Sequence, residues 1–191
     1  MFLRKAALRP IPSYAVVEEE TLEAVERGLD EEHRPIQDTL DEGFRELDRS
    51  QPSLAGWLAE QVARREDEMA QSIGYFLVVM VYMAFRRSFS IRLTEVDDAA
   101  LVLALETLST DEAIRADDPA EVLESDDVLA MGQPALLSFV QHHMMEALTQ
   151  AGDEADLNEL GRVYRAVLVE VIALSGAVQA PPGLGDAAAL A

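Results

Sequence analysis

The chain has 191 residues, which fits one domain or a tightly fused pair, and its 49% of hydrophobic residues are enough for a core, so disorder throughout is not expected. Its 36 acidic and 15 basic residues give a formal net charge of −21, which opposes binding to a nucleic-acid backbone or to an anionic membrane surface. The absence of cysteine excludes disulfides, thiolate zinc sites and thiol nucleophiles.

The first thirteen residues are expected to form an N-terminal tail. Pro10 and Pro12 prevent a continuous helix there, because proline lacks the backbone N–H that a helix interior needs. The basic start has no following apolar segment of the kind that a secretory signal requires, so the sequence predicts a cytoplasmic protein.

Three amphipathic helices are predicted next. The first spans 14–32, and the other two begin at Pro35 and Pro52, because proline is tolerated in the first turn of a helix. Their apolar faces are expected to contain Val16 or Val17, Leu22, Val25 and Leu29; Ile36, Leu40, Phe44 and Leu47; and Leu54, Trp57, Leu58 and Val62. Between Glu18 and Asp48 there are thirteen acids and only three arginines. The first two helices should therefore expose a strongly negative surface.

The stretch from Ile73 to Phe85 contains thirteen residues without a charge. A helix of that length reaches about 20 Å, whereas the hydrocarbon core of a bilayer is about 30 Å thick. Arg86 and Arg87 follow it, where cations suit the negative end of a helix. The stretch therefore predicts a buried central helix and no membrane segment, after a polar patch at 64–68 that is either a turn or exposed helix.

In the second half, Thr94 is the expected N-cap of a well-buried helix. That helix contains Val96, Leu101, Leu103, Leu105 and Leu108. Two short helices are predicted around 111–116 and 119–124, and a longer one opens at Pro134. The last predicted helix, over 156–178, has apolar residues at Leu157, Leu160, Tyr164, Val167, Leu168, Val171, Leu174 and Val178.

The two halves of the chain, 14–90 and 94–178, resemble each other. Aligning Gln51 with Gln133 places Q-P-S-L-A-G-W-L beside Q-P-A-L-L-S-F-V, with three identities in eight positions. Each segment precedes an apolar helix that contains tyrosine. A chance recurrence of proline at helix starts is the alternative. An internal repeat predicts that the two core helices, around 73–85 and 156–178, pack together.

The sequence offers one candidate for metal binding, formed by His142, His143 and Glu146. Residues three and four apart on a helix lie on one face, so both histidines can approach the glutamate. Neither the H-E-x-x-H motif nor the Glu-x-x-His pairs of di-iron bundles occur, and ordinary surface or partly buried histidines are the alternative. No nucleophile elbow, P-loop or dinucleotide-binding loop is present, and no cofactor or catalytic residue is predicted.

The sequence thus predicts an all-α protein, with a single compact bundle of about six to eight helices spanning 14–180 and a flexible tail at 181–191. This bundle contains two related halves if the repeat is real. The expected function is a non-enzymatic protein-interaction or regulatory module. Its expected partner is a protein, and a partner with a basic surface would complement the acidic chain. The alternatives are a metal- or carboxylate-dependent enzyme and an acidic mimic of nucleic acid. Direct nucleic-acid binding is not expected, and homo-oligomerisation is left open.

Overall fold

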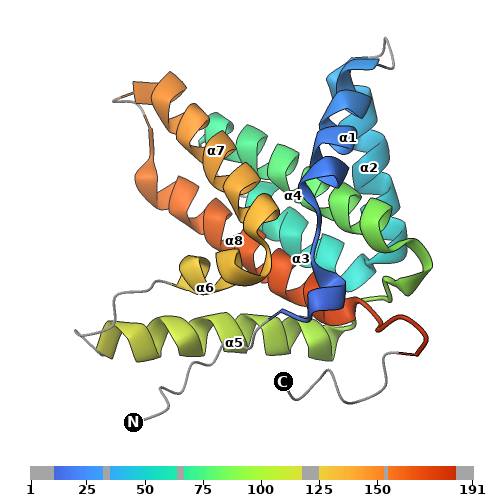
Figure 1. The fold of residues 1–191 in the computed structure, drawn as a ribbon. Coiled ribbons are helices and arrows are strands. Elements are labelled where there is room, and N and C mark those ends of the chain that lie inside the picture. The colour runs from blue at the N-terminus through green and yellow to red at the C-terminus, as the bar shows by residue number, and fades with distance from the viewer. Residues whose placement is uncertain (1–10, 32–34, 64–66, 118–124, 153–154, 184–191) are drawn as a thin grey trace.

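The computed structural model describes residues 11–31, 35–63, 67–117, 125–152 and 155–183. These residues form an all-α bundle, as predicted (Figure 1). The helices of the described part are α1 (Glu19–Glu31), α2 (Ile36–Ser50), α3 (Pro52–Ala63), α4 (Glu68–Phe89), α5 (Asp98–Asp117), α6 (Ser125–Gly132), α7 (Pro134–Ala151) and α8 (Leu157–Ala177), with short 3-10 turns at Ser13–Ala15 and Ser90–Arg92.

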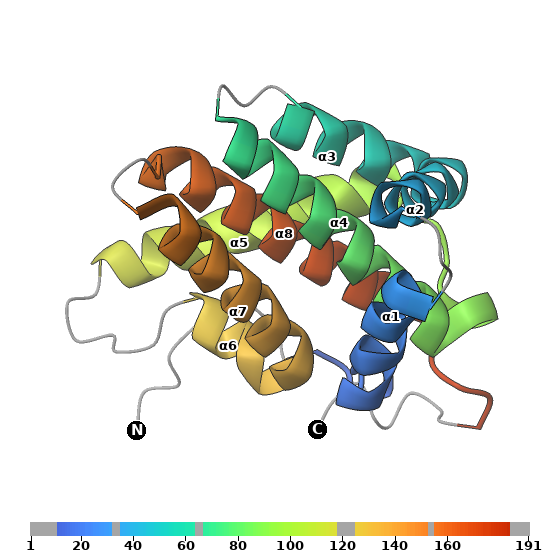
Figure 2. The ribbon, with the colours of Figure 1, turned by 90° about the horizontal axis from the view of Figure 1, so that it is seen from above.

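Helices α4 and α8 run side by side through the centre of the bundle (Figures 1 and 2). The segments 77–82 of α4 and 166–171 of α8 are buried without interruption. Each helix begins with an aspartate cap, because the side chains of Asp67 and Asp156 accept hydrogen bonds from the second and third backbone N–H groups that follow. The contacts between α4 and α8 confirm the predicted packing of the two apolar helices against each other.

Helix α4 is longer than its uncharged stretch. It continues into the following turn, and the 25-residue segment Glu68–Arg92 is long and apolar enough to cross a membrane by length and composition alone. A buried core helix meets the same criterion, and 56% of the most apolar part of this segment is enclosed by the protein. The length argument from thirteen residues is therefore wrong, and composition alone does not separate the two interpretations.

Proline marks the predicted starts correctly. Helix α2 follows Pro35, and α3 and α7 begin at Pro52 and Pro134. The predicted apolar faces of α2 and α3 are largely buried, because Leu40, Leu47, Leu54, Leu58 and Val62 all lie in the core. Phe44 and Trp57 pack partly buried against that core, whereas Ile36 is 49% exposed.

Three expected boundaries are wrong. The helix expected from residue 14 begins only at Glu19, because the chain before it is extended at Val16. Thr94 does not cap α5: its hydroxyl donates to the carbonyl of Ala177, and Asp97 caps the helix through the N–H of Ala100. The short helix expected at 111–116 is the end of α5, and α6 was not anticipated. The short helix expected at 119–124 lies outside the described residues.

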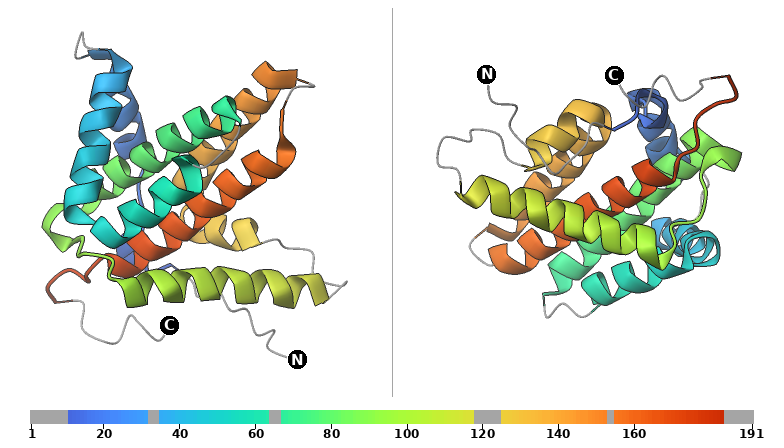
Figure 3. Two further views of the ribbon diagram at one scale, coloured as in Figure 1. Left: turned by 180° about the vertical axis from the view of Figure 1, so that it is seen from behind. Right: turned by 90° about the horizontal axis from the view of Figure 1, so that it is seen from below.

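Helix α5 lies across one end of the bundle (Figures 1 and 3). It packs on α8 and α3 and, unlike the prediction, is buried on one side only. Leu101, Ala104 and Leu108 face the core, whereas Leu103 is 64% exposed. The leucine-rich sequence of α5 places apolar residues on both sides of the helix, so the sequence alone does not indicate which side is buried.

Two buried glutamines join distant parts of the chain through matching hydrogen bonds. Gln51, before α3, donates to the carbonyl of Thr94 at 2.9 Å and accepts from the N–H of Val96 at 2.7 Å. Gln133, before α7, donates to the carbonyl of Ala15 at 2.7 Å and accepts from the N–H of Val17 at 2.9 Å. Each amide therefore pairs with the extended segment that precedes the first long helix of the other half.

Candidate functional site

A cleft of about 730 Å³ opens between the start of α2, the end of α3, the first half of α4 and the second half of α7. This volume lies in the range of about 300–1,000 Å³ that is typical of ligand sites. The described side chains that line it are Ile36, Gln37, Leu40, Val62, Ala63, Glu68, Met69, Gln71, Ser72, Ile73, Tyr75, Phe76, His143, Glu146, Ala147 and Gln150.

The cleft combines an apolar surface with acidic groups. Aliphatic and aromatic side chains from α2, α3 and α4 line it, including Ile73 and Phe76. Glu68 of α4 and Glu146 of α7 contribute carboxylates. No lysine or arginine occurs among the described lining residues. The described surface of the cleft thus favours a ligand that is apolar and positively charged.

A hydrogen-bonded group of three residues lies beside the cleft, on α2 and α4. The hydroxyl of Tyr75 donates to Oδ1 of Asp41 at 2.8 Å, and the amide of Gln37 donates to the same oxygen at 2.9 Å. The hydrogen bond from Tyr75, followed by that from Gln37 and the charge of Arg45, lowers the pKa of Asp41. Burial and the Asp41 carboxylate raise the pKa of Tyr75 to about 12, so Tyr75 remains a donor.

His143 lies between two aromatic rings and two carboxylates. Its ring meets Phe139 and Phe76 edge to face, with centroids 4.4 and 5.0 Å apart. Its Nε2 lies 3.5 Å from a carboxylate oxygen of Glu26 in α1, and its Nδ1 lies 3.7 Å from one of Glu146. The side chain is only 19% exposed, so His143 helps to join α7 to α1 and α4.

The other predicted metal candidate, His142, is 71% exposed, and its Nε2 lies 4.0 Å from Glu146. The structure thus brings His142, His143 and Glu146 together, as their spacing predicted. Within the described part of the chain, however, no group of three or more histidine, cysteine, aspartate or glutamate side chains is arranged to hold a metal ion. The metal site stays a prediction.

Sequence reasoning did not identify Gln37, Asp41 and Tyr75 as a site. Gln37 and Asp41 are four apart on α2, a spacing that allows their hydrogen bond. A tyrosine within an uncharged stretch also signals a polar partner, because a buried hydroxyl is usually hydrogen-bonded. Nothing in the sequence indicated that the partner of Tyr75 would be Asp41, 34 residues earlier.

A buried carboxyl group lies elsewhere, in the central helix α8. The side chain of Glu170 is completely buried, and neither of its oxygens has a hydrogen-bond partner. Burial raises the pKa of Glu170 well above its ordinary value of 4.5. Because Glu170 does not line the cleft, it has no direct access to a ligand bound there.

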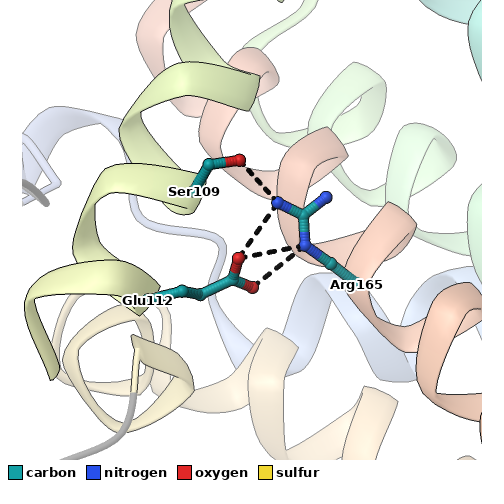
Figure 4. Close-up of polar contacts among 3 residues, drawn as sticks. All are labelled: Ser109, Glu112 and Arg165. Carbon is teal, nitrogen blue, oxygen red and sulfur yellow. Dashed lines mark hydrogen bonds and ion pairs between the residues drawn. The ribbon is translucent and has the colours of Figure 1, made fainter. Parts of the chain in front are cut away.

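A polar cluster outside the cleft connects α5 to α8 (Figure 4). The Nε of Arg165 donates to both oxygens of Glu112 at 3.0 and 3.1 Å, and its Nη2 donates to Glu112 at 3.0 Å and to Ser109 at 2.8 Å. Ser109 and Glu112 point from α5 toward the guanidinium on α8 (Figure 4). With its guanidinium engaged in this way, Arg165 serves to hold the two helices together.

Comparisons with protein-family models, with curated proteins and with solved structures find no match to this chain. Its function therefore has to be argued from the chemistry of the cleft.

Proposed function

We propose that this protein is a non-enzymatic protein-interaction module whose cleft holds a basic, amphipathic helix of a partner protein. The supporting observation is the composition of the cleft, which joins an apolar surface to Glu68 and Glu146 with no described basic side chain. An amphipathic helix places its apolar residues in such a groove and its cations against the rim. The net charge of −21 favours encounter with a basic partner.

The arrangement supports the interaction hypothesis better than the enzyme hypothesis. A carboxylate enzyme that transfers protons near neutral pH needs a carboxyl group whose pKa is raised and that a substrate can reach. Glu170 has the raised pKa but lies outside the cleft. The hypothesis of nucleic-acid mimicry uses only the acidic exterior and leaves the apolar cleft without a role.

Binding of two synthetic peptides to the full-length protein tests the proposal. Both peptides are amphipathic helices with leucine on one face, and their other face carries arginine in one peptide and glutamate in the other. Fluorescence anisotropy should detect saturable binding of the arginine peptide and none of the glutamate peptide. Equal binding of both peptides, or of neither, would contradict the proposal.

Two isoleucine variants locate the binding surface. Ile36 lines the cleft and is 49% exposed, whereas Ile91 is 92% exposed and lies outside the cleft. Ile36→Asp should weaken binding of the arginine peptide at least about tenfold, since burying an isoleucine contributes about 1.5–3 kcal/mol. Ile91→Asp should leave it unchanged. A different result is that the wild type has twice the mass of one chain in solution and that Ile36→Asp restores the mass of one chain. That result would place a second copy of this chain in the cleft.

We also propose that the two halves of the bundle are related repeats. The matching hydrogen bonds of Gln51 and Gln133 support this relation. Buried residues at equivalent positions of the two halves also support it. Counted from the extended segments 15–17 and 94–96, the buried pairs are Leu22 with Leu101, Val25 with Ala104 and Leu29 with Leu108. Counted from Gln51 and Gln133, they are Leu54 with Leu136, Leu58 with Val140 and Val62 with Met144. These pairs extend well beyond the short sequence match, which disfavours a chance recurrence of proline.

A chimeric chain tests the repeat. Replacing 133–140 by the sequence of 51–58 should keep Gln133 and Pro134 and preserve a cooperative thermal unfolding transition. A control replacement that uses 52–59 shifts the segment by one residue and removes the glutamine, and it should abolish that transition. If both chimeras unfold alike, the two segments are not equivalent.

A further inference from the structure

The proposed function leaves open which group in or beside the cleft recognises the charge of the bound helix. On the basis of that function, we propose that Asp41, held by Tyr75 and Gln37, binds a guanidinium or ammonium group of the partner helix. Tyr75 and Gln37 both line the cleft, and Asp41 accepts a hydrogen bond from each of them. The carboxylate therefore lies beside the cleft, where a cationic side chain of a bound helix would meet it.

The hydrogen bonds orient this carboxylate before any ligand arrives. Both donors use Oδ1, so Oδ2 has no hydrogen-bond partner among the described residues. Because Tyr75 and Gln37 lie on two different helices, the carboxylate is fixed relative to both α2 and α4. A group that is already ordered loses little conformational entropy on binding, so the contact contributes more of its energy to affinity.

The chemistry of the group selects a cation. An ionised carboxylate only accepts hydrogen bonds, and its bonds to cationic donors are stronger than those between neutral groups. Two neutral donors already occupy Oδ1, and an aspartate carboxyl group is ionised at neutral pH. The packing of Tyr75 on Phe44, with ring centroids 5.5 Å apart, further fixes the phenol that orients the carboxylate.

A purely structural role for Asp41 makes a different prediction. If Asp41 only joined α2 to α4 through Tyr75, its loss would lower stability and affect every ligand of the cleft equally. A recognition role requires that Asp41→Asn weakens binding of a cationic peptide more than binding of its neutral counterpart. The neutral counterpart is the same leucine-faced peptide with citrulline in place of arginine, which keeps the shape of the side chain and removes its charge.

The experiment compares the arginine and citrulline peptides on four forms of the full-length protein. The wild type should prefer arginine by at least about tenfold, because hydrogen bonds to charged groups are the stronger class. Asp41→Asn should reduce this preference to about threefold or less, and Tyr75→Phe should reduce it by a smaller factor. Asp48→Asn removes the same charge from an exposed position on α2 and should keep the wild-type preference.

The outcomes separate this inference from the proposed function. An unchanged arginine preference in Asp41→Asn, with binding still lost in Ile36→Asp, overturns the role of Asp41 and leaves the cleft as the binding surface. Equal losses in Asp41→Asn and Asp48→Asn show that only overall charge matters and also overturn it. Failure of both peptides to bind the wild type overturns the proposed function itself.

Discussion

A Cβ atom placed on Gly43 of α2 would stand 2.6 Å from Cγ1 of Val79 in α4. Real Cβ atoms essentially never approach another heavy atom so closely. Val79 is completely buried, so it has little room to move aside. Helix α2 therefore reaches its position against the central helix because residue 43 has no side chain. Gly43 follows Asp41 by two residues on α2.

Gly43→Ala should lower the free energy of unfolding by about 1–3 kcal/mol, because the added methyl group overpacks the contact between α2 and α4. The matched control is Gly56→Ala in α3, where a Cβ would meet nothing within 4 Å. That change should raise stability by about 0.5–1 kcal/mol, since alanine favours the helix. Urea unfolding of both variants measures the difference, and equal effects would contradict the close approach.

Gln133→Leu should lower the free energy of unfolding by about 2–4 kcal/mol, because it leaves the carbonyl of Ala15 and the N–H of Val17 without their partner. Gln141→Leu changes an exposed glutamine of α7 that donates a hydrogen bond to the hydroxyl of Tyr164, and it should lower stability by no more than about 1 kcal/mol. Hydrogen exchange at Val17 adds a local readout. Its protection should fall in Gln133→Leu alone; similar exchange in both variants would show that the amide contributes little.

Glu170→Leu should stabilise the protein by about 1–3 kcal/mol under mildly acidic conditions, because it removes an unpaired polar group from the core. The stabilisation should grow with pH. The folded state keeps the proton of Glu170, whereas the unfolded chain loses it above its ordinary pKa of 4.5. The wild type therefore loses stability as the pH rises from 4.5 toward the raised pKa, at up to about 1.4 kcal/mol per pH unit.

The measurement for Glu170 is the difference in unfolding free energy between wild type and Glu170→Leu across that pH range. Other carboxylates titrate in both proteins, so their contribution cancels in the difference. A difference that stays constant with pH would mean that Glu170 is ionised in the folded protein and has a partner there.

The pair Arg165–Glu112 should couple only modestly, by about 0.5–1 kcal/mol in a double-mutant cycle of the two alanine variants. Its side chains are 38% and 40% exposed, so water and salt screen the charges. The coupling should fall when salt is raised from low to high concentration. A coupling of several kcal/mol that salt does not change would indicate a buried pair.

Local signals in the sequence predicted most of the helices. Pro35, Pro52 and Pro134 marked three starts because the preference of proline for the first helical turn depends only on its own ring and missing N–H. The uncharged stretch of α4 likewise indicated a helix that is apolar on all sides, which lies either in a protein core or in a membrane. The spacing of His142, His143 and Glu146 brought those groups together for the same local reason.

The partners of single side chains could not be predicted in this way. Thr94 resembles a helix cap, yet its hydroxyl bonds to Ala177, 83 residues away, and Asp97 caps α5 instead. Leu103 resembles a core residue, but α5 has two apolar sides and only its packing on α8 decides which one is buried. Asp41 does not differ in its sequence context from the other acids of α2, and only the fold brings Tyr75 beside it.

The sequence by itself therefore determined an acidic, all-α protein, the starts of several helices and its two most apolar helices, because these depend on composition and on spacing along one helix. Only the tertiary structure decided that Gln51 and Gln133 each bind the other half, that Asp41 lies beside Tyr75, and that Glu170 is enclosed without a partner. It also placed the candidate cleft between helices from both halves. The physical reason is distance along the chain: helical periodicity acts over a few residues, whereas each of these contacts joins segments that only the fold brings together.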